Sequence, residues 1–372
     1  MKSITSTIPV LEKRKRDKAA KNLGYINFDE DNLYPQRTEN YIQSSGTATA
    51  CVVLFSKFIR GEGFKDSNFY KSRVNAKGLT VDQFLRALTW DYARHKGFAY
   101  HVQYNMLAQP ISVTPVKFKR IRIGDISQIE YNGRYIWSNC WEERKQTDII
   151  IYEPFNLDKS VIYKQIEAAG GIKAYRGQIF YYSEEMECYP LSAIDAVLED
   201  VVADSKTKTY RMNLTSRSFL ADKGIEFPFE FESPDAREEM KKNLEQFQGT
   251  ENAGKLMMLE NPNPEFRIEL HDFAMSNGDK MFTVTNETCK HSIIQQFNQP
   301  LSLLSTIMPS NFGQPQIVEG FNFYNKMTVD ERLVFEEQFK KLFSAWYYPI
   351  NPSGNYSIIP LQYESSTSST TV

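Results

Sequence analysis

The sequence has few of the residues that build metal centres and disulfide scaffolds. Its four cysteines, Cys51, Cys140, Cys188 and Cys289, are widely spaced and form no C-x-x-C pair. This pattern argues against a zinc site and against a disulfide framework, and it suits a reducing cytoplasm. The four histidines form no H-x-x-x-H or H-E-x-x-H pair, so we expect no metal and no cofactor.

Long apolar runs and an excess of basic charge are also missing. No apolar run approaches the ~18 residues of a membrane span, and no apolar stretch follows the basic N-terminal cluster as in a signal peptide. We therefore expect no membrane partner. Lys and Arg number 44 against 46 Asp and Glu, for a net charge of −2. Tight nucleic-acid binders are normally basic, so any contact with DNA is expected to be loose or confined to a local stripe.

The composition is otherwise that of a folded protein that is rich in aromatic side chains. Of the 372 residues, 41% are hydrophobic, and the 25 Phe and 21 Tyr suit large buried interfaces as well as cores. Residues 1–22 contain a cluster of six basic residues at 13–21, and the segment is either an arm for DNA or an acidic partner, or a mobile solvated terminus. Residues 364–372 form a low-complexity tail rich in Ser and Thr.

The first half of the chain predicts two helices followed by strands. Residues 47–61 are mostly apolar and predict a buried helix that Gly61 ends. Thr80 and Gln83 fit a capping box, and the helix that they open is expected to stop at Gly97. Residues 99–105 predict a strand, and the alternation in 120–124 predicts another with one charged edge.

Two long, polar helices are expected further on. The first covers residues 192–222, with Ser192 and Asp195 capping its start and Lys223 and Gly224 suited to its end. Its middle, 204–209, is polar all round. Such a helix bridges solvent or packs against copies of itself, and an exposed helix of a monomer is the alternative. The second long helix covers 277–298 and is followed by an uncharged loop at 301–316.

A small α/β unit is expected between the long helices. Residues 233–247 predict a helix, and 256–260 and 266–270 predict two strands of a hairpin. After the loop, Thr328 and Glu331 fit a second capping box. It opens an amphipathic helix whose apolar face holds Phe335, Phe339, Leu342, Phe343 and Trp346.

Residues 249–255 fit the spacing of a phosphate-binding loop, G-x-x-x-x-G-K. The magnesium-binding Ser or Thr is replaced by Leu256, and the predicted helix precedes the loop where a strand is required. No helix N-terminus would therefore point at the phosphates. We interpret the segment as a Gly-rich turn; the alternative is a nucleotide-binding enzyme that uses Gly249 and Lys255.

The region from 189 to 304 resembles the portal protein of tailed bacteriophages. Three features match in order. The first is a turn before a Leu-rich strand, with Gly249, Asn252, Gly254 and Lys255. The second is the start of a helix, with Asn277, Gly278, Asp279 and Phe282, and the third is the end of that helix, with Ile293, Ile294, Phe297, Pro300, Leu303 and Leu304. The resemblance extends over about 25–347. It implies a non-enzymatic ring, of twelve subunits in this family, at one vertex of a virion capsid, assembled in the cytoplasm of the bacterial host.

This resemblance implies an α+β, portal-like fold with little or no crown. Its parts would be a flexible basic N-terminal arm (1–22), the N-terminal part of a β-rich and helical wing (23–188), a first stem helix (189–222), a small α/β clip (223–272), a second stem helix (273–300), a tunnel-loop region (301–318), the C-terminal part of the wing (319–350) and a C-terminal tail (351–372).

The resemblance also implies sites and partners. The tunnel loop facing DNA would include Ser305, Met308, Ser310, Asn311 and Gln314; the stem helices would present Lys206, Lys208, Arg211, Asp279 and Lys280; the clip would dock partners through Arg237, Lys241, Glu260, Asn261, Asn263 and Arg267. The partners would be double-stranded DNA, the major capsid protein, the terminase and then the head-tail adaptor. A neutral loop suits a channel in which a polyanion slides, because fixed ion pairs would hold it in register; an ordinary surface loop is the alternative.

Other classes remain open beside this resemblance. An ATP-dependent or nucleolytic enzyme would need an acid at a strand end for magnesium, and Asp148 stands before its apolar run instead. A different ring-forming protein, such as a tail adaptor or a capsid-associated protein, is the second alternative, although adaptors are usually much shorter.

Overall fold

The computed structural model describes residues 18–19, 24–142, 149–185, 189–217, 223–226, 235, 238, 269–272, 278–304 and 314–363. The chain divides into two compact units. Unit 1 holds Met1–Val201 and Ser292–Val372, and unit 2 holds Val202–His291. Helices and strands are mixed throughout, so the expected α+β class is confirmed. None of the helices in the described ranges is long and apolar enough to cross a membrane.

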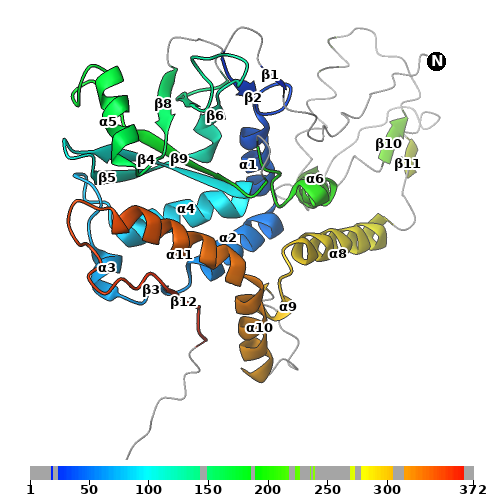
Figure 1. The fold of residues 1–372 in the computed structure, drawn as a ribbon. Coiled ribbons are helices and arrows are strands. Elements are labelled where there is room, and N and C mark those ends of the chain that lie inside the picture. Colours follow the sequence, from blue (N-terminus) through cyan, green and yellow to red (C-terminus); the bar gives the residue numbers. More distant parts are fainter. Residues whose placement is uncertain are drawn as a thin grey trace, which may run out of the picture. The chain divides into compact units, whose positions relative to one another are not determined.

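A six-stranded sheet with the order β5-β4-β9-β8-β7-β6 lies at the centre of unit 1 (Figure 1). Its strands are β4 (Gly97–Tyr104), β5 (Pro110–Val116), β6 (Ile121–Ile123), β7 (Tyr135–Trp137), β8 (Ile150–Pro154) and β9 (Gln178–Ser183). Neighbours are antiparallel except β8 and β9. A parallel pair needs a crossover, and the connection between these strands contains α5 (Lys159–Ala168).

Helix α4 (Val81–His95) lies along one face of the sheet (Figure 1). Its predicted capping box is confirmed, because the Thr80 hydroxyl accepts from the Gln83 amide N–H and the Gln83 side chain accepts from the Thr80 N–H. The helix ends slightly earlier than predicted. Lys96 adopts the left-handed conformation (φ 55°), and Gly97 already belongs to β4.

Helix α2 (Gly46–Arg60) packs beside α4 and confirms the predicted buried helix. The Ser45 hydroxyl caps its start by accepting from the Ala48 N–H. Gly61 ends it at φ +56°, where a Cβ atom would lie 2.0 Å from the carbonyl oxygen of Ile359. Glycine at this position therefore lets the last residues of the chain approach the end of α2.

Helix α11 (Val329–Ser344) is the predicted amphipathic helix. Four of its expected core residues, Phe335, Phe339, Leu342 and Phe343, are buried on the helix; Trp346 is also buried but lies just after the helix ends. Their rings contact aromatic residues of distant segments, with centroids 4.7 Å apart for Phe98 and Phe335 and 4.9 Å for Phe64 and Phe339. The core of unit 1 is thus built from both ends of the sequence.

The expected C-terminal tail is partly a core element. Ile358–Ile359 form β12, which pairs antiparallel with β3 (Gly63–Phe64). Tyr356 and Ile358 are buried beside α3 (Ser67–Lys71) and β3, with Tyr356 stacked edge-on to Phe69 at 5.3 Å. The prediction of a separate tail from 351 is therefore wrong up to the last described residue, Tyr363.

The expected charged edge of the 120–124 strand is also wrong. Arg122 in β6 has no exposed surface. Its guanidinium donates to the side-chain and main-chain oxygens of Asn32 and to the main-chain oxygen of Ile121, and it lies 4.7 Å from the ring of Trp141. Carbonyl acceptors and aromatic faces satisfy the cation in place of water.

The second expected capping box does not form, because another helix precedes it. The predicted loop at 301–316 overlaps α9 (Leu301–Leu304) and α10 (Gln314–Met327). With helical residues on both sides, the Thr328 hydroxyl donates to the carbonyl of Tyr324 and caps nothing in α11. It also accepts from Arg332, whose guanidinium reaches the carbonyl of Phe58 near the end of α2.

Near the N-terminus, part of the expected flexible arm is a strand. β1 (Lys18–Ala19) pairs antiparallel with β2 (Ile26–Asn27), so the arm boundary at residue 22 is wrong. Helix α1 (Tyr34–Ser44) follows. The rest of the basic cluster lies outside the described residues.

Unit 2 contains most of the two long helices. Helix α6 runs Leu198–Arg217 after the 3-10 turn Asp195–Val197, so it begins six residues later than expected, and Ser192 and Asp195 do not cap its start. Helix α8 runs Gly278–Gln296, within the expected 277–298. Lys223 and Gly224 do not end α6, because they belong to β10 (Lys223–Glu226), which pairs with β11 (Glu269–Asp272). The predicted 256–260 strand, the 249–255 turn and most of the 233–247 helix lie outside the described residues.

Candidate functional site

The expected tunnel loop is only partly visible. Ser305, Met308, Ser310 and Asn311 lie outside the described residues, and Gln314 is the first residue of α10. Gln314 is therefore not a loop residue, and the region 301–318 contains two helical segments. The six expected clip residues, Arg237, Lys241, Glu260, Asn261, Asn263 and Arg267, also lie outside the described part.

The expected stem residues are all helical. Lys206, Lys208 and Arg211 lie on α6, and Asp279 and Lys280 lie in the first turn of α8. Lys206 and Lys208 are exposed, and the ammonium of Lys208 pairs with Asp204 at 2.8 Å, one helical turn away. The polar middle of α6 is not uniformly solvated, since Asp204 and Thr207 are buried.

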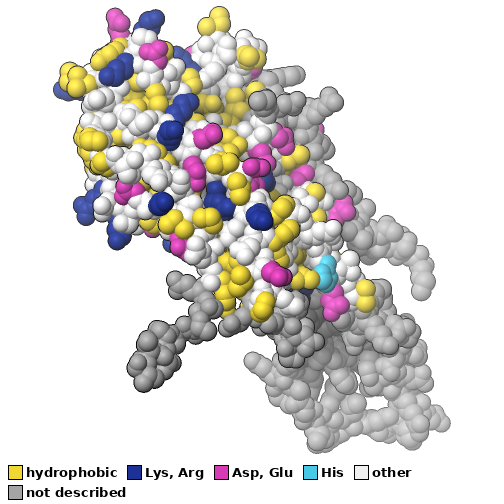
Figure 2. Space-filling view, turned by 60° about the horizontal axis from the view of Figure 1, so that its bottom comes forward, with side chains coloured by type: hydrophobic (Ala, Val, Ile, Leu, Met, Phe, Trp, Pro, Cys, Tyr) yellow, Lys and Arg dark blue, Asp and Glu magenta, His cyan; other side chains and the backbone are white. Residues whose placement is uncertain are grey.

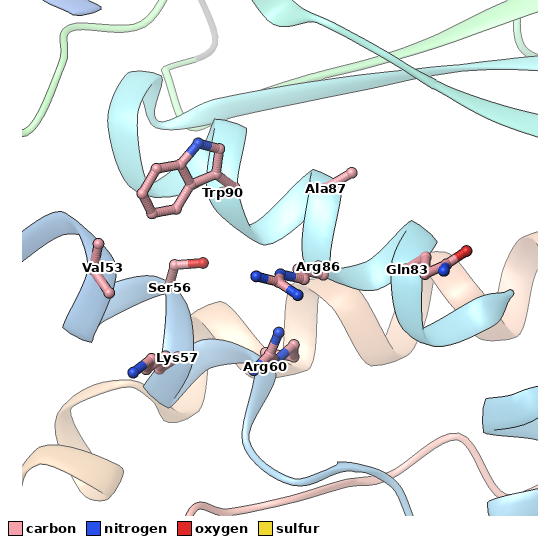
Figure 3. A pocket seen from close by; sticks show the side chains of 8 residues that line it. All are labelled: Val53, Ser56, Lys57, Arg60, Gln83, Arg86, Ala87 and Trp90. Atoms are coloured by element: carbon pink, nitrogen blue, oxygen red, sulfur yellow. The ribbon is translucent and has the colours of Figure 1, made fainter. Parts of the chain in front are cut away.

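A pocket of about 470 Å³ lies between α2 and α4 in unit 1 (Figure 3). Four of its lining residues come from each helix: Val53, Ser56, Lys57 and Arg60 from α2, and Gln83, Arg86, Ala87 and Trp90 from α4. Both sets follow the spacing i, i+3, i+4 and i+7, which places each on one helix face. Figure 3 shows Arg60 and Arg86 pointing toward one another from the two helices.

The walls of this pocket are fixed by contacts between and along the helices. The Ser56 hydroxyl donates to the Thr89 hydroxyl at 3.3 Å and joins α2 to α4. The Arg94 guanidinium stacks on the Trp90 ring at 4.4 Å. The Gln83 side chain is engaged in the capping box, and the charged residues of the lining are three cations, Lys57, Arg60 and Arg86.

Sequence reasoning missed this cluster because its members are far apart in the chain. Lys57 and Arg60 are the only charged residues of the otherwise apolar α2, and this was the available signal. Arg86 belongs to α4, and its proximity depends on how the two helices pack. The rest of the charge is mixed: the face in Figure 2 intersperses Lys and Arg with Asp, Glu and apolar side chains.

Most other buried charges of unit 1 stabilise the fold. The Glu39 carboxylate lies 3.0 Å from Arg94, 2.5 Å from Lys119 and 3.4 Å from His95. Burial alone would raise the pKa of Glu39, but its hydrogen bonds to His95 and Lys119 outweigh that effect and lower the pKa to about 2. Glu39 therefore stays ionised and joins α1 to α4 and η1 (Phe118–Arg120).

A second pocket, of about 610 Å³, lies between α10, α11 and residues 360–363. Arg332 lines it, but its guanidinium is already bonded to main-chain oxygens of Phe58 and Asn325. Among the described residues no group of three or more His, Cys, Asp or Glu side chains is placed to hold a metal ion.

The fold is similar to that of proteins from virus-like particles. A chain from the virion of the native gene transfer agent particle matches with a TM-score of 0.50 at 13% identity, over 87% of this chain and 83% of that one. A chain from the neck of the empty particle, computed with C6 symmetry, matches with a TM-score of 0.49 at 13% identity over 89% and 85%. An HK97-family phage portal protein from Corynebacterium diphtheriae matches with a TM-score of 0.48 at 8% identity over 81% and 89%.

One of these neighbours is thus a phage portal protein, the family that the sequence resembles. No protein-family model matches the chain, and no curated protein sequence matches it significantly. At 13% identity and a TM-score of 0.50, the similarity to the chain from the virion of the gene transfer agent particle indicates a shared fold.

Proposed function

We propose that this chain is a portal protein that forms a ring at one vertex of a capsid. In this role the ring is the conduit through which the genome enters and leaves the particle. It also docks the terminase during packaging and the head-tail adaptor afterwards. The protein makes or breaks no covalent bond in this role, and its specificity lies in geometry.

The observation that carries this proposal is the fold similarity to a virion protein over 87% of the chain. The ordered set of sequence features from Gly249 to Leu304 points to the same class. The two long helices, α6 and α8, fit the expected stem. Polar residues buried in α6 suit a helix that packs through polar contacts.

Native mass spectrometry with negative-stain class averages tests the proposal. Purified protein is expected to form rings of about a dozen subunits with an open axial hole, because a heterologous interface that closes generates a ring. Addition of a scaffold or capsid partner is the control for a subunit that assembles only with help. A monomer or dimer that persists in its presence contradicts the proposal.

If the protein stays a monomer or dimer, a nucleotide-binding enzyme is the alternative to be tested next. Its test is a Lys255→Ala variant and an assay of ATP binding by the purified chain. We expect no measurable binding by either protein, because Leu256 supplies no hydroxyl for magnesium.

A further inference from the structure

The pocket between α2 and α4 has a charge that the described part of the protein does not neutralise. Its lining includes the cations Lys57, Arg60 and Arg86 and no carboxylate. No ion pair within 4.0 Å engages any of the three with a described residue. Helix α4 carries two acids, Asp82 and Asp91, and each has another partner: Asp82 accepts from the Tyr70 hydroxyl and Asp91 from the Phe118 N–H.

Four other cations of unit 1 have a carboxylate partner. Arg94 and Lys119 pair with Glu39, Lys96 pairs with Glu184 at 3.1 Å, and Arg134 pairs with Glu153 at 2.9 Å. Three like charges directed at one groove repel each other, at a cost that an external anion removes. The lining of the α2–α4 pocket, with three cations and no carboxylate, suits an anion.

We propose that the α2–α4 pocket binds the phosphodiester backbone of nucleic acid. Two guanidinium forks facing each other, Arg60 and Arg86, match the oxygens of a phosphate, and Lys57 adds a point charge one turn away on α2. Lys57 and Arg60 are separated by nearly one turn of α2, and the pitch of such a helix is about 5.4 Å. Cations spaced in this way suit a ligand with several phosphates in a row better than a ligand with a single carboxylate. Trp90, held by Arg94, gives the groove a rigid aromatic wall.

This inference rests on the proposed function, since a conduit for DNA brings phosphates to the protein. The inference also agrees with the net charge of −2. This charge argues against a broad basic surface, but it is compatible with one local cluster of cations. The pocket is defined by the packing of two apolar-faced helices, so its cations hold fixed relative positions.

The test is duplex binding by the full-length protein, measured by fluorescence anisotropy across a salt series. The variant carries Lys57→Gln, Arg60→Gln and Arg86→Gln. The matched control carries Lys117→Gln, Lys164→Gln and Lys173→Gln, which removes the same charge from exposed lysines elsewhere in unit 1. Thermal melting of both proteins confirms that they fold.

The pocket variant is expected to bind the duplex about tenfold or more weakly than the control. Its slope of log K against log salt should fall by about 1 to 3, because each phosphate contact contributes about 0.9. Inorganic phosphate, compared with chloride at equal ionic strength, should compete only weakly. Equal affinities of variant and control overturn the proposal, and so does full competition by inorganic phosphate, which would make this a site for the free ion.

Ring assembly tests whether the α2–α4 pocket instead binds carboxylates of a second copy of the chain. If the pocket variant loses its rings in native mass spectrometry but keeps its duplex affinity, the site binds carboxylates of a second copy and the nucleic-acid proposal is wrong. Intact rings with no effect of the pocket variant on binding overturn this inference alone. A pocket-dependent loss of binding by a protein that never forms rings overturns the proposed portal function alone.

Discussion

Helices α2 and α6 are both long, but they obtain their stability from different sources. Helix α2 buries Cys51, Val52, Phe58 and Ile59 completely within its own chain. Helix α6 has polar residues through its middle, and its Met212 is 60% exposed. The first helix is fixed by packing within its own chain, whereas the second keeps Lys206, Lys208 and Met212 exposed. Variants in the two helices should therefore differ strongly in their effect on the isolated subunit.

Truncation of Phe58 should have the largest effect. Its ring lies 4.8 Å from Tyr324 and 5.2 Å from Phe321, so Phe58→Ala removes contacts between α2 and α10. We expect a loss of about 3–5 kcal/mol in the free energy of unfolding, measured by urea denaturation. Met212→Ala in α6 is the control and should change it by less than about 0.5 kcal/mol. Similar losses for both variants would contradict the comparison.

Removal of the Glu39 carboxylate should rank second. Glu39→Ala leaves Arg94 and Lys119 without their buried partner, and we expect a loss of about 2–4 kcal/mol in the same assay. Because the pKa of Glu39 is lowered to about 2, its contribution is present above about pH 4.5 and is lost as the pH falls toward 2. The free energy of unfolding of the Glu39→Ala variant should therefore depend less on pH in this range. The same pH dependence in the variant and the unmodified protein would contradict the prediction.

Variants of the two predicted capping boxes should differ by about 1 kcal/mol in the free energy of unfolding that they lose. Thr80→Ala removes an acceptor for the Gln83 N–H and should cost about 1 kcal/mol. Thr328→Ser keeps the hydroxyl that bonds Tyr324 and Arg332 and should cost less. Thermal melts of the two single variants measure this difference, and a larger loss for Thr328→Ser than for Thr80→Ala would contradict the prediction.

The smallest effect is expected from the ion pair of α6. Lys208→Ala removes a pair one turn apart with Asp204, which is worth about 0.3–0.5 kcal/mol in an isolated helix. Exposed Lys206→Ala is the control with no pair to lose among the described residues. If Lys208→Ala instead lowers the ring population in native mass spectrometry while subunit stability holds, the α6 surface contributes to assembly.

Much of the fold could be predicted where local patterns agree with packing. The apolar run of α2, the cap at Thr80 and the face of α11 are properties of short segments, and each was identified correctly. Errors arose where distant segments decide the environment. Arg122 is buried because Asn32 and Trp141 fold over it, and no pattern in residues 120–124 shows this.

The candidate site was less predictable than the fold for the same reason. The α2–α4 pocket needs Arg60 and Arg86 to meet across two packed helices, a contact that sequence spacing does not encode. The predicted cap at Thr328 is wrong because α10 directly precedes this residue. The sequence of α10 has too weak a helical pattern to be distinguished from the neighbouring loop. The expected tunnel-loop and clip residues stay predictions, apart from Gln314, which lies in a helix.

The pairing of β12 with β3 also constrains the order of events during synthesis. Ile358 pairs with Phe64, and between them the ribosome must make all of unit 2. Residues 24–201 alone lack α11 and β12, so a nascent chain that has emerged that far cannot close its core. Such non-local closure is slow and leaves apolar surface exposed meanwhile. The core of unit 1 can therefore close only after the segment that forms β12 has been synthesised.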